Sequence, residues 1–161
     1  MKNRRKFTAA FGWLITILPE ARRLEMPVDD TRKTMEIWFN GDVKALSDDV
    51  VFEDMGNHMG RGRTFRGRQA VGDWSNWLWS DAFEATPELV KMIVDEDSAV
   101  LEFTIAGTHK GEFAGVAGTG KEVRVPACIT YDLNGEGKIN RGRVYVLVNT
   151  CLEQIGEGRS A

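Results

Sequence analysis

The stretch Gly107-Thr108-His109-Lys110-Gly111-Glu112-Phe113, followed by Gly118-Thr119-Gly120-Lys121, decides the fold of this chain. The first block ends a run from Ala99 to Ile105 that has the period-two apolar pattern of a β-strand. The second block has the glycines that a turn requires. Clean alternation then resumes from Glu122 to Asp132, with Val123, Val125, Ala127, Ile129 and Tyr131 on one side. The two blocks therefore predict the connection between two neighbouring strands.

The rest of the chain predicts helices before the connection and strands on both sides of it. A helix is expected from Asp29 or Asp30 to Gly41, and a second one from Gln69 to Phe83. The glycines and arginines between Gly56 and Gly67 predict a loop. The further strands are expected at 50–52, 89–94 and 141–148. This order predicts an α+β fold with a curved antiparallel sheet and helices packed on one of its faces.

Composition restricts the class of protein. A chain of 161 residues is long enough for one domain with a sizeable core. The net charge of −3 gives no electrostatic reason to expect nucleic acid as a partner. The two cysteines, Cys128 and Cys151, and the two histidines lack the spacing of metal ligands. We therefore expect no metal and no cofactor.

The first residues form a basic and then apolar extension, which we assign to 1–28, before a domain at 29–161. The extension partly resembles an export signal, but its apolar run from Phe7 to Leu18 is too short to span a bilayer. Charged residues at 20–23 stand where a cleavage site would be. The apolar residues have helical spacing, so we expect an extra N-terminal helix, no stable membrane span and a cytoplasmic location.

The two glycine-rich blocks, with Gly137-Lys138-Ile139 and Gln154-Ile155-Gly156 after them, resemble the SnoaL-like polyketide cyclases of the nuclear-transport-factor-2-like superfamily. The resemblance covers residues 29–156 and implies a cone-shaped sheet around an apolar pocket. It also implies a homodimer and a small apolar ligand, ring-containing or polyketide-like. The implied reaction is cofactor-free acid/base chemistry, such as cyclisation, isomerisation, dehydration or epoxide opening.

Two residues are candidates for catalysis. His109 shares a strand face with Phe103, so it would enter the pocket as an acid, base or hydrogen-bond donor. The alternative is a histidine bonded to a neighbouring backbone group at the end of a strand. Asp54 follows Phe52 by two positions and would be the partner base, or would instead cap the turn at Gly56.

The last strand departs from the family pattern. The resemblance implies an acidic residue seven positions before Gln154, where this chain has Leu147, and an aliphatic side chain cannot transfer a proton. Two other functions therefore stay open: a binding module without chemistry, and a hydrolase similar to limonene-epoxide hydrolase that uses Asp54 instead. The residues expected around the ligand are Phe52, Trp74, Phe103, Arg143, Tyr145, Leu147 and Asn149.

Overall fold

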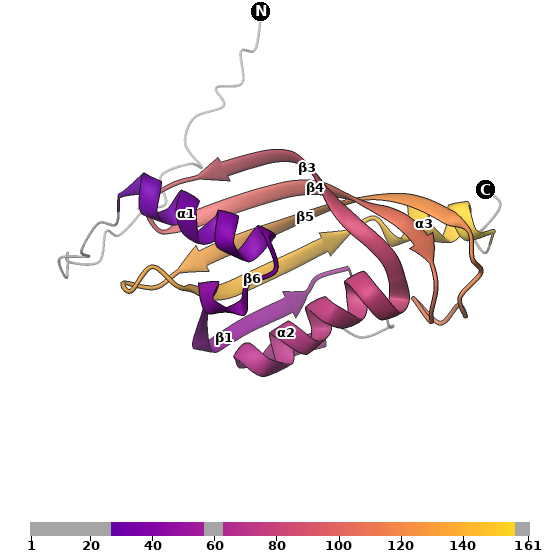
Figure 1. Cartoon of the computed structure of the whole chain (residues 1–161), viewed down its shortest axis with the longest axis horizontal. Helices are drawn as coiled ribbons and strands as arrows, with labels where there is room; N and C mark the ends of the chain where they lie inside the picture. The colour runs from indigo at the N-terminus through magenta and orange to yellow at the C-terminus, as the bar shows by residue number, and fades with distance from the viewer. Residues whose placement is uncertain (1–26, 57–62, 157–161) are drawn as a thin grey trace, which may run out of the picture.

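The computed structural model describes residues 27–56 and 63–156, which build a curved six-stranded sheet with helices against it (Figure 1). The elements in chain order are α1 (Val28–Phe39), η1 (Val43–Ala45), β1 (Leu46–Asp54), β2 (Arg63–Arg66), α2 (Arg68–Asn76), η2 (Trp77–Ala82), β3 (Phe83–Val94), β4 (Ser98–His109), β5 (Glu122–Leu133), β6 (Ile139–Val146) and α3 (Val148–Ile155). The α+β class is confirmed. The expected N-terminal helix lies outside the described residues, and the division at residue 28 stays a prediction.

The sheet is mixed, although we predicted an antiparallel one. Its strand order is β2-β1-β6-β5-β4-β3, and the pair β1–β6 is parallel while the other pairs are antiparallel. The sequence pattern gives the direction of neighbours joined by short turns, such as β4 and β5. It gives no direction for β1 and β6, because most of the chain lies between them.

The segment predicted as a loop between Gly56 and Gly67 contains a strand. Residues Arg63–Arg66 form β2, which pairs with the end of β1 in the register Asp54↔Arg63 and Val51↔Arg66. Arginines favour an edge strand, where their side chains reach solvent. The strand could not be predicted from this segment, because four residues are too few to show the alternation of apolar and polar side chains.

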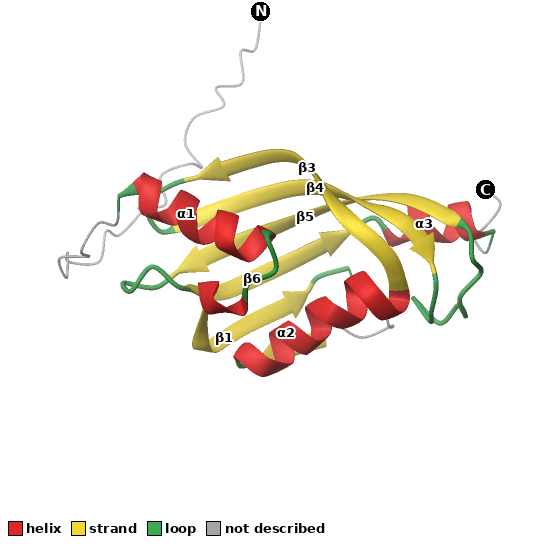
Figure 2. Ribbon diagram, in the orientation of Figure 1, coloured by secondary structure: helices red, strands yellow, loops and turns green. Residues whose placement is uncertain are grey.

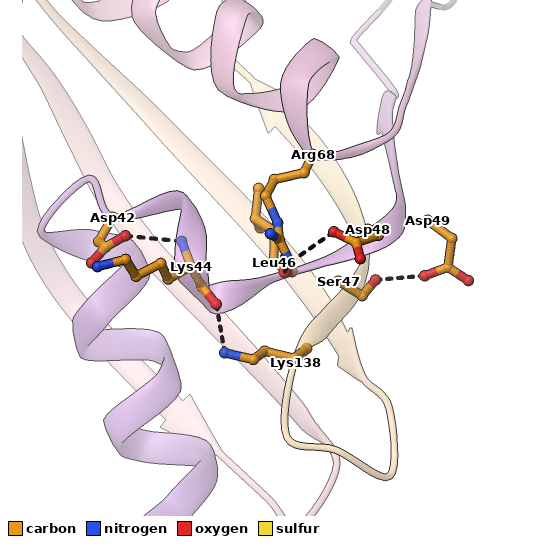
Figure 3. Close-up of polar contacts among 8 residues, drawn as sticks. All are labelled: Asp42, Lys44, Leu46, Ser47, Asp48, Asp49, Arg68 and Lys138. Atoms are coloured by element: carbon orange, nitrogen blue, oxygen red, sulfur yellow. Dashed lines mark hydrogen bonds and ion pairs between the residues drawn. The ribbon is translucent and has the colours of Figure 1, made fainter.

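Polar contacts fix the start of β1 (Figure 3). The Arg68 guanidinium on α2 donates to the Leu46 carbonyl oxygen from Nε at 3.2 Å and from Nη2 at 2.9 Å. It also forms an ion pair with Asp48 at 3.0 Å. From the other side, Lys138 Nζ donates to the Lys44 carbonyl oxygen at 2.6 Å. These bonds tie β1 to α2, and they tie η1 to the turn that precedes β6.

The helices α1 and α2 lie on the same face of the sheet, α1 in front of β3 to β5 and α2 in front of β1 (Figure 2). The helix α3 lies at the other end of the sheet and contacts β5. Register shifts interrupt the pairing of β1 with β6, of β3 with β4 and of β5 with β6. Such irregularities bend strands, so the sheet curves around the core on its inner face.

The core follows the alternation read from the sequence. The inner residues of β5, from Val123 to Leu133, are buried at every second position. Phe52 is fully buried and makes edge contacts with Trp38, Trp74 and Tyr131 at centroid distances of 5.7, 5.8 and 6.0 Å. Within the described ranges, no helix has the length and apolar character needed to cross a bilayer. The cytoplasmic location stays a prediction.

Candidate functional site

A cavity of about 270 Å³ lies between the two front helices and the inner face of the sheet. The helical segments contribute Trp38, Phe39, Asn40, Gly41, Trp74, Ser75, Leu78 and Trp79 to its wall. The strands contribute Ala85, Pro87, Leu101, Phe103, Ile129, Tyr131, Val144 and Val146. None of these described lining residues is Asp, Glu, His, Lys or Arg. Such a wall suits an uncharged apolar molecule, because a charged group would lose its hydration without a partner.

The segment η2 shapes one side of this cavity. It is a turn of π-helix that follows α2 directly, and such turns occur frequently at functional sites. Leu78 and Trp79 from this turn line the cavity, and the ring of Trp79 packs against Phe103 at 6.0 Å. The wider turn therefore places two bulky side chains on the cavity wall in succession.

A hydrogen bond joins two residues of the cavity wall, one on α1 and one on β5. Trp38 Nε1 donates to the hydroxyl oxygen of Tyr131 at 3.1 Å, and Tyr131 is only 2% exposed. Burial raises the pKa of the Tyr131 phenol, and the hydrogen bond from Trp38 opposes this shift. The phenol therefore stays protonated at neutral pH. Our sequence analysis placed Tyr131 on the same side of its strand as four apolar residues, without identifying it as a site residue.

A second, small hollow adjoins the cavity and contains Asp54. It has a volume of about 20 Å³ and shares Trp74, Leu78, Val144 and Val146 with the cavity wall. Asp54 and Arg63 are the charged residues at this hollow. One oxygen of Asp54 accepts a hydrogen bond from the Gly56 N–H at 3.1 Å, so Asp54 caps the turn as well as reaching the hollow.

His109 faces the inner side of the sheet, as expected from its strand, but it does not line the cavity. It is fully buried, and its ring packs against Phe83 at a centroid distance of 5.6 Å. Its Nδ1 accepts the Thr119 N–H at 3.3 Å and lies 3.1 Å from the Thr119 hydroxyl. The structure therefore matches the alternative in which this histidine holds the backbone at a strand end.

Burial lowers the pKa of the His109 imidazole. A backbone group of Gly111 opposes part of this shift, although within the described residues Nε2 has no hydrogen bond of standard geometry. Because Nδ1 accepts from a backbone N–H, the neutral ring carries its proton on Nε2. A neutral histidine that is enclosed in this way supports structure more directly than proton exchange with a ligand.

The glycines of the same stretch stand where two backbones meet. A Cβ at Gly118 would collide with the carbonyl oxygen of Lys110, and one at Gly107 would collide with Glu84 and Ala85 of β3. A side chain of any kind is therefore excluded at both positions. We call residues 107–121 together with α3 the motif corner.

Gln154 completes the motif corner. The strand β6 ends at Val146, so beyond this point the edge of β5 has no strand beside it. The Gln154 amide takes its place, because its oxygen accepts the Arg124 N–H at 2.7 Å and its nitrogen donates to the Arg124 carbonyl oxygen at 3.0 Å. Lys121 Nζ donates to the Ile155 carbonyl oxygen at 2.8 Å. These side-chain hydrogen bonds dock the Gln-Ile-Gly segment on the sheet.

The side chains of β6 point to the opposite sides of the sheet from those that we expected. Tyr145 and Leu147, which we expected at the pocket, are 43% and 57% exposed and lie on the outer face of the sheet. Arg143 is also absent from the cavity wall and contacts Asp132 at 3.3 Å and Glu53 at 3.8 Å. Val144 and Val146 take the inner positions, because burial of the valines is favourable while the polar residues alternating with them keep contact with water.

The other expected ligand contacts divide into three groups. Trp74 and Phe103 line the cavity. Phe52 is buried in the aromatic cluster beneath it and is not on the wall. Asn149 is exposed on α3, away from the cavity wall. Sequence reasoning therefore found two wall residues and missed Trp38 and Tyr131.

The described ranges contain no group of three or more His, Cys, Asp or Glu residues that could hold a metal ion. The fold and the cavity define a cone-shaped α+β protein with an apolar, small-molecule-sized cavity. The family model for SnoaL-like polyketide cyclases matches residues 30–155. The chain belongs to this family. A search of curated protein sequences gives no match.

Solved structures agree on the fold. A protein of Jannaschia sp. CCS1 assigned as a SnoaL-like polyketide cyclase superposes with a TM-score of 0.70 at 16% identity, covering 83% of this chain and 96% of the other. A phenazine biosynthesis-related protein of Pseudomonas aeruginosa has a TM-score of 0.64 at 15% identity, with 83% and 85% covered. A Catenulispora acidiphila protein with a ketosteroid isomerase-like fold, in complex with trimethylamine, has a TM-score of 0.60 at 18% identity, with 81% and 95% covered.

Proposed function

We propose that this protein binds one small, uncharged, ring-containing organic molecule in the cavity between α1, η2 and the sheet. The observation that carries the proposal is the wall itself, which is mostly aromatic and aliphatic and has Asn40, Ser75 and Tyr131 as its polar residues. Trp38, Trp74, Trp79 and Phe103 offer flat faces to a flat ligand. The ligand is held by burial and stacking and oriented by few polar groups.

The family and one of the structural neighbours support a ring-containing ligand. The family model is that of polyketide cyclases, and the Pseudomonas aeruginosa neighbour is related to phenazine biosynthesis. The first name refers to the cyclisation of polyketides, and the second refers to phenazine, a compound with fused rings. At these identities the neighbours themselves establish only a common fold, so the ligand class is our proposal and rests on the cavity wall.

Filling the cavity tests this function. Val146→Phe on β6 would place a ring in the space where the ligand lies, and we expect the affinity for tetralin, an apolar bicyclic probe, to fall at least about tenfold. The matched control is Tyr145→Phe, which changes the adjacent residue on the outer face and should leave tetralin affinity unchanged. Calorimetric titration measures both. Equal affinities of Val146→Phe and the unmodified protein would show that the cavity is not the binding site.

A second candidate function is acid/base chemistry on the bound ligand with Asp54 as the base. The hollow at Asp54 supports it, because it shares four wall residues with the cavity and its volume of about 20 Å³ is enough for one water molecule. A water molecule there would lie between the carboxylate and the ligand space. Cyclisation, isomerisation, dehydration and hydrolytic epoxide opening all need such a proton-transfer group. His109 takes no part in this proposal, because its ring is engaged in the motif corner.

Asp54→Asn tests the second candidate. The substitution keeps the oxygen that accepts from Gly56 and removes the base. Once a substrate is identified, we expect kcat to fall by about 10²-fold or more while binding changes little. Asp49→Asn, at the exposed and opposite end of β1, is the matched control and should keep full activity. Full activity of Asp54→Asn would leave the protein with the binding function alone.

A further inference from the structure

A mostly apolar groove lies on the outer face of the sheet, opposite the cavity. It has a volume of about 280 Å³ and is lined by Ile93 of β3, Val100 of β4, Pro126 and Cys128 of β5, and Tyr145 and Leu147 of β6. Ile93, Tyr145 and Leu147 are exposed although they are large and apolar. Among the described helices, α1 and α2 lie on the opposite face, and α3 lies beside β5 at Arg124. The described part of the chain therefore leaves this groove uncovered.

The dimensions of the groove suit one short helix. Along the strands it begins at Val100, which pairs with Thr130. It ends at Pro126, which pairs with Thr104, and this distance is about 13 Å at the rise of a β-strand. Across the strands it extends from β3 to β6, which is about 14 Å. A helix of about 12 residues is about 18 Å long, so it matches the diagonal of this surface.

The neighbouring part of the outer face is charged and disfavours a broad apolar partner. A polar hollow there is lined by Glu53, Arg66, Asp97, Asp132 and Arg141. A stable interface between two proteins buries about 800 Å² on each partner, so a second copy would have to cover these charges together with the groove. A narrow occupant covers the apolar part alone and leaves the charged side chains in water.

The described chain begins near one end of the groove. Pro27 precedes α1, and Thr31 in the first turn of this helix donates from Oγ1 to the Glu96 carbonyl oxygen at 2.5 Å. Glu96 lies in the turn between β3 and β4, close in sequence to Ile93 of the groove. The eight residues at 19–26 reach roughly 26 Å when extended. They can therefore connect α1 to the outer face around the β3–β4 turn.

Residues 7–18 of the N-terminal extension have the matching length and pattern. Phe7, Phe11, Leu14 and Leu18 have the spacing of one helix face, which is typical of a helix that packs against an apolar surface. The extension lies outside the described residues, and the proposed binding function assigns no role to it. A short tether gives such a segment an effective concentration of about 1 mM at the groove, so weak docking is enough to keep it there.

We propose that residues 7–18 of the same chain dock in the outer groove as a helix, with their apolar face against the sheet. The segment and a second copy of the chain exclude one another on this groove. A homodimer that uses the outer face would therefore form when the segment leaves it. The proposal does not depend on the ligand in the cavity, because the groove and the cavity lie on opposite faces of the sheet.

Cys128 in the groove allows a direct test on the full chain. Leu14→Cys places a thiol in the middle of the apolar face of the segment, and Thr16→Cys places one about 200° away on the helix. We expect the intrachain disulfide with Cys128 to form at least about tenfold faster in Leu14→Cys, at about pH 8.5 under oxidising conditions. The other cysteine, Cys151, is buried. Mass spectrometry of non-reduced peptides identifies the disulfide, and circular dichroism checks the fold of each variant.

Two substitutions on β3 test whether the groove is the docking site. Ile93→Asp places a carboxylate in the groove and should lower the disulfide rate of Leu14→Cys to that of Thr16→Cys. Val90→Asp is the matched control, because Val90 is exposed on the same strand without lining the groove, and it should leave the rate unchanged. Equal rates in Leu14→Cys and Thr16→Cys, or no disulfide to Cys128 in either, would overturn the proposal. Dimers linked through Cys128 would overturn it as well, because they would show that another copy occupies the groove.

Discussion

The motif corner and the cavity differ in how the sequence encodes them. The motif corner contains glycines that admit no side chain, a buried histidine bonded to Thr119 and a glutamine that replaces a missing strand. Only a few residue types satisfy each of these positions, so the corner has a recognisable sequence. The cavity wall consists mostly of Leu, Val, Ile and aromatic residues, which occur in every core. The most recognisable sequence therefore marks the site of closest backbone packing, and the ligand site has no comparable signature.

The largest expected effect comes from Gly118→Ala in the motif corner. A Cβ at this position would collide with the Lys110 carbonyl oxygen, and backbone atoms cannot move aside as a flexible side chain can. We expect a loss of about 3 kcal/mol in the free energy of unfolding. Gly135→Ala is the control, because nothing lies within 4 Å of a Cβ at Gly135. Urea unfolding measures the stability of both variants. A similar loss of stability in the two would show that the close backbone packing at Gly118 is not the cause.

We expect the burial of His109 to have a smaller effect on the free energy of unfolding, and this effect depends on pH. The imidazole has its pKa lowered from 6.5 in the fold, so the unfolded chain takes up the proton first as the pH falls. The neutral His109 imidazole therefore makes its full contribution to the free energy of unfolding above pH 6.5. Below this pH the contribution is lost, by at most about 1.4 kcal/mol per pH unit.

The variant His109→Gln separates this contribution from other acid effects. It should be about 1–2 kcal/mol less stable at neutral pH and should lose less stability than the unmodified protein between about pH 7 and pH 5. Parallel pH dependences in the two proteins would mean that the imidazole does not titrate differently in the fold. Tetralin binding at neutral pH should be the same in both, because His109 is not on the cavity wall.

The smallest effect is expected from Leu147→Asp on the outer face. Leu147 is 57% exposed, so the free energy of unfolding should change by less than about 0.5 kcal/mol, and no proton-transfer activity should appear. Ile93 of β3, which lines the same outer-face groove as Leu147, is 52% exposed, so apolar surface is left uncovered there. The homodimer stays a prediction, and we expect it to use this surface. Sedimentation that is unchanged by Leu147→Asp would exclude Leu147 from such an interface.

The fold was predictable where local patterns determine it. Alternation along β5 identified Tyr131 as an inner residue, and the glycine blocks identified the connection from β4 to β5. The parallel pairing of β1 with β6 was not predictable, because it depends on contacts between distant segments. The strand β2 was not predictable either, because its four residues are extended through their pairing with β1.

The candidate site was predictable only in part. Trp74 and Phe103 follow from apolar periodicity, and both lie on the wall. The faces of β6 were assigned by counting to Leu147, and a shift of one residue reverses every side chain of a strand. The apolar series Val144 and Val146 would have given the observed orientation. The proximity of Trp38 to Tyr131 depends on how α1 packs over β5, which no local pattern contains.

The parallel pair β1–β6 has a consequence for the order of folding. The ion pair between Glu53 and Arg141 joins residues 88 positions apart, whereas β3, β4 and β5 pair through successive hairpins. Closing a short loop costs less chain entropy than closing a long one, so we expect the β3–β5 meander to form first. During synthesis on the ribosome, β1 is made well before β6, so β1 has no partner for the parallel pair until then. The ring of Phe52 lies against Gly142 of β6, so we expect the aromatic core to close only when β6 pairs with β1.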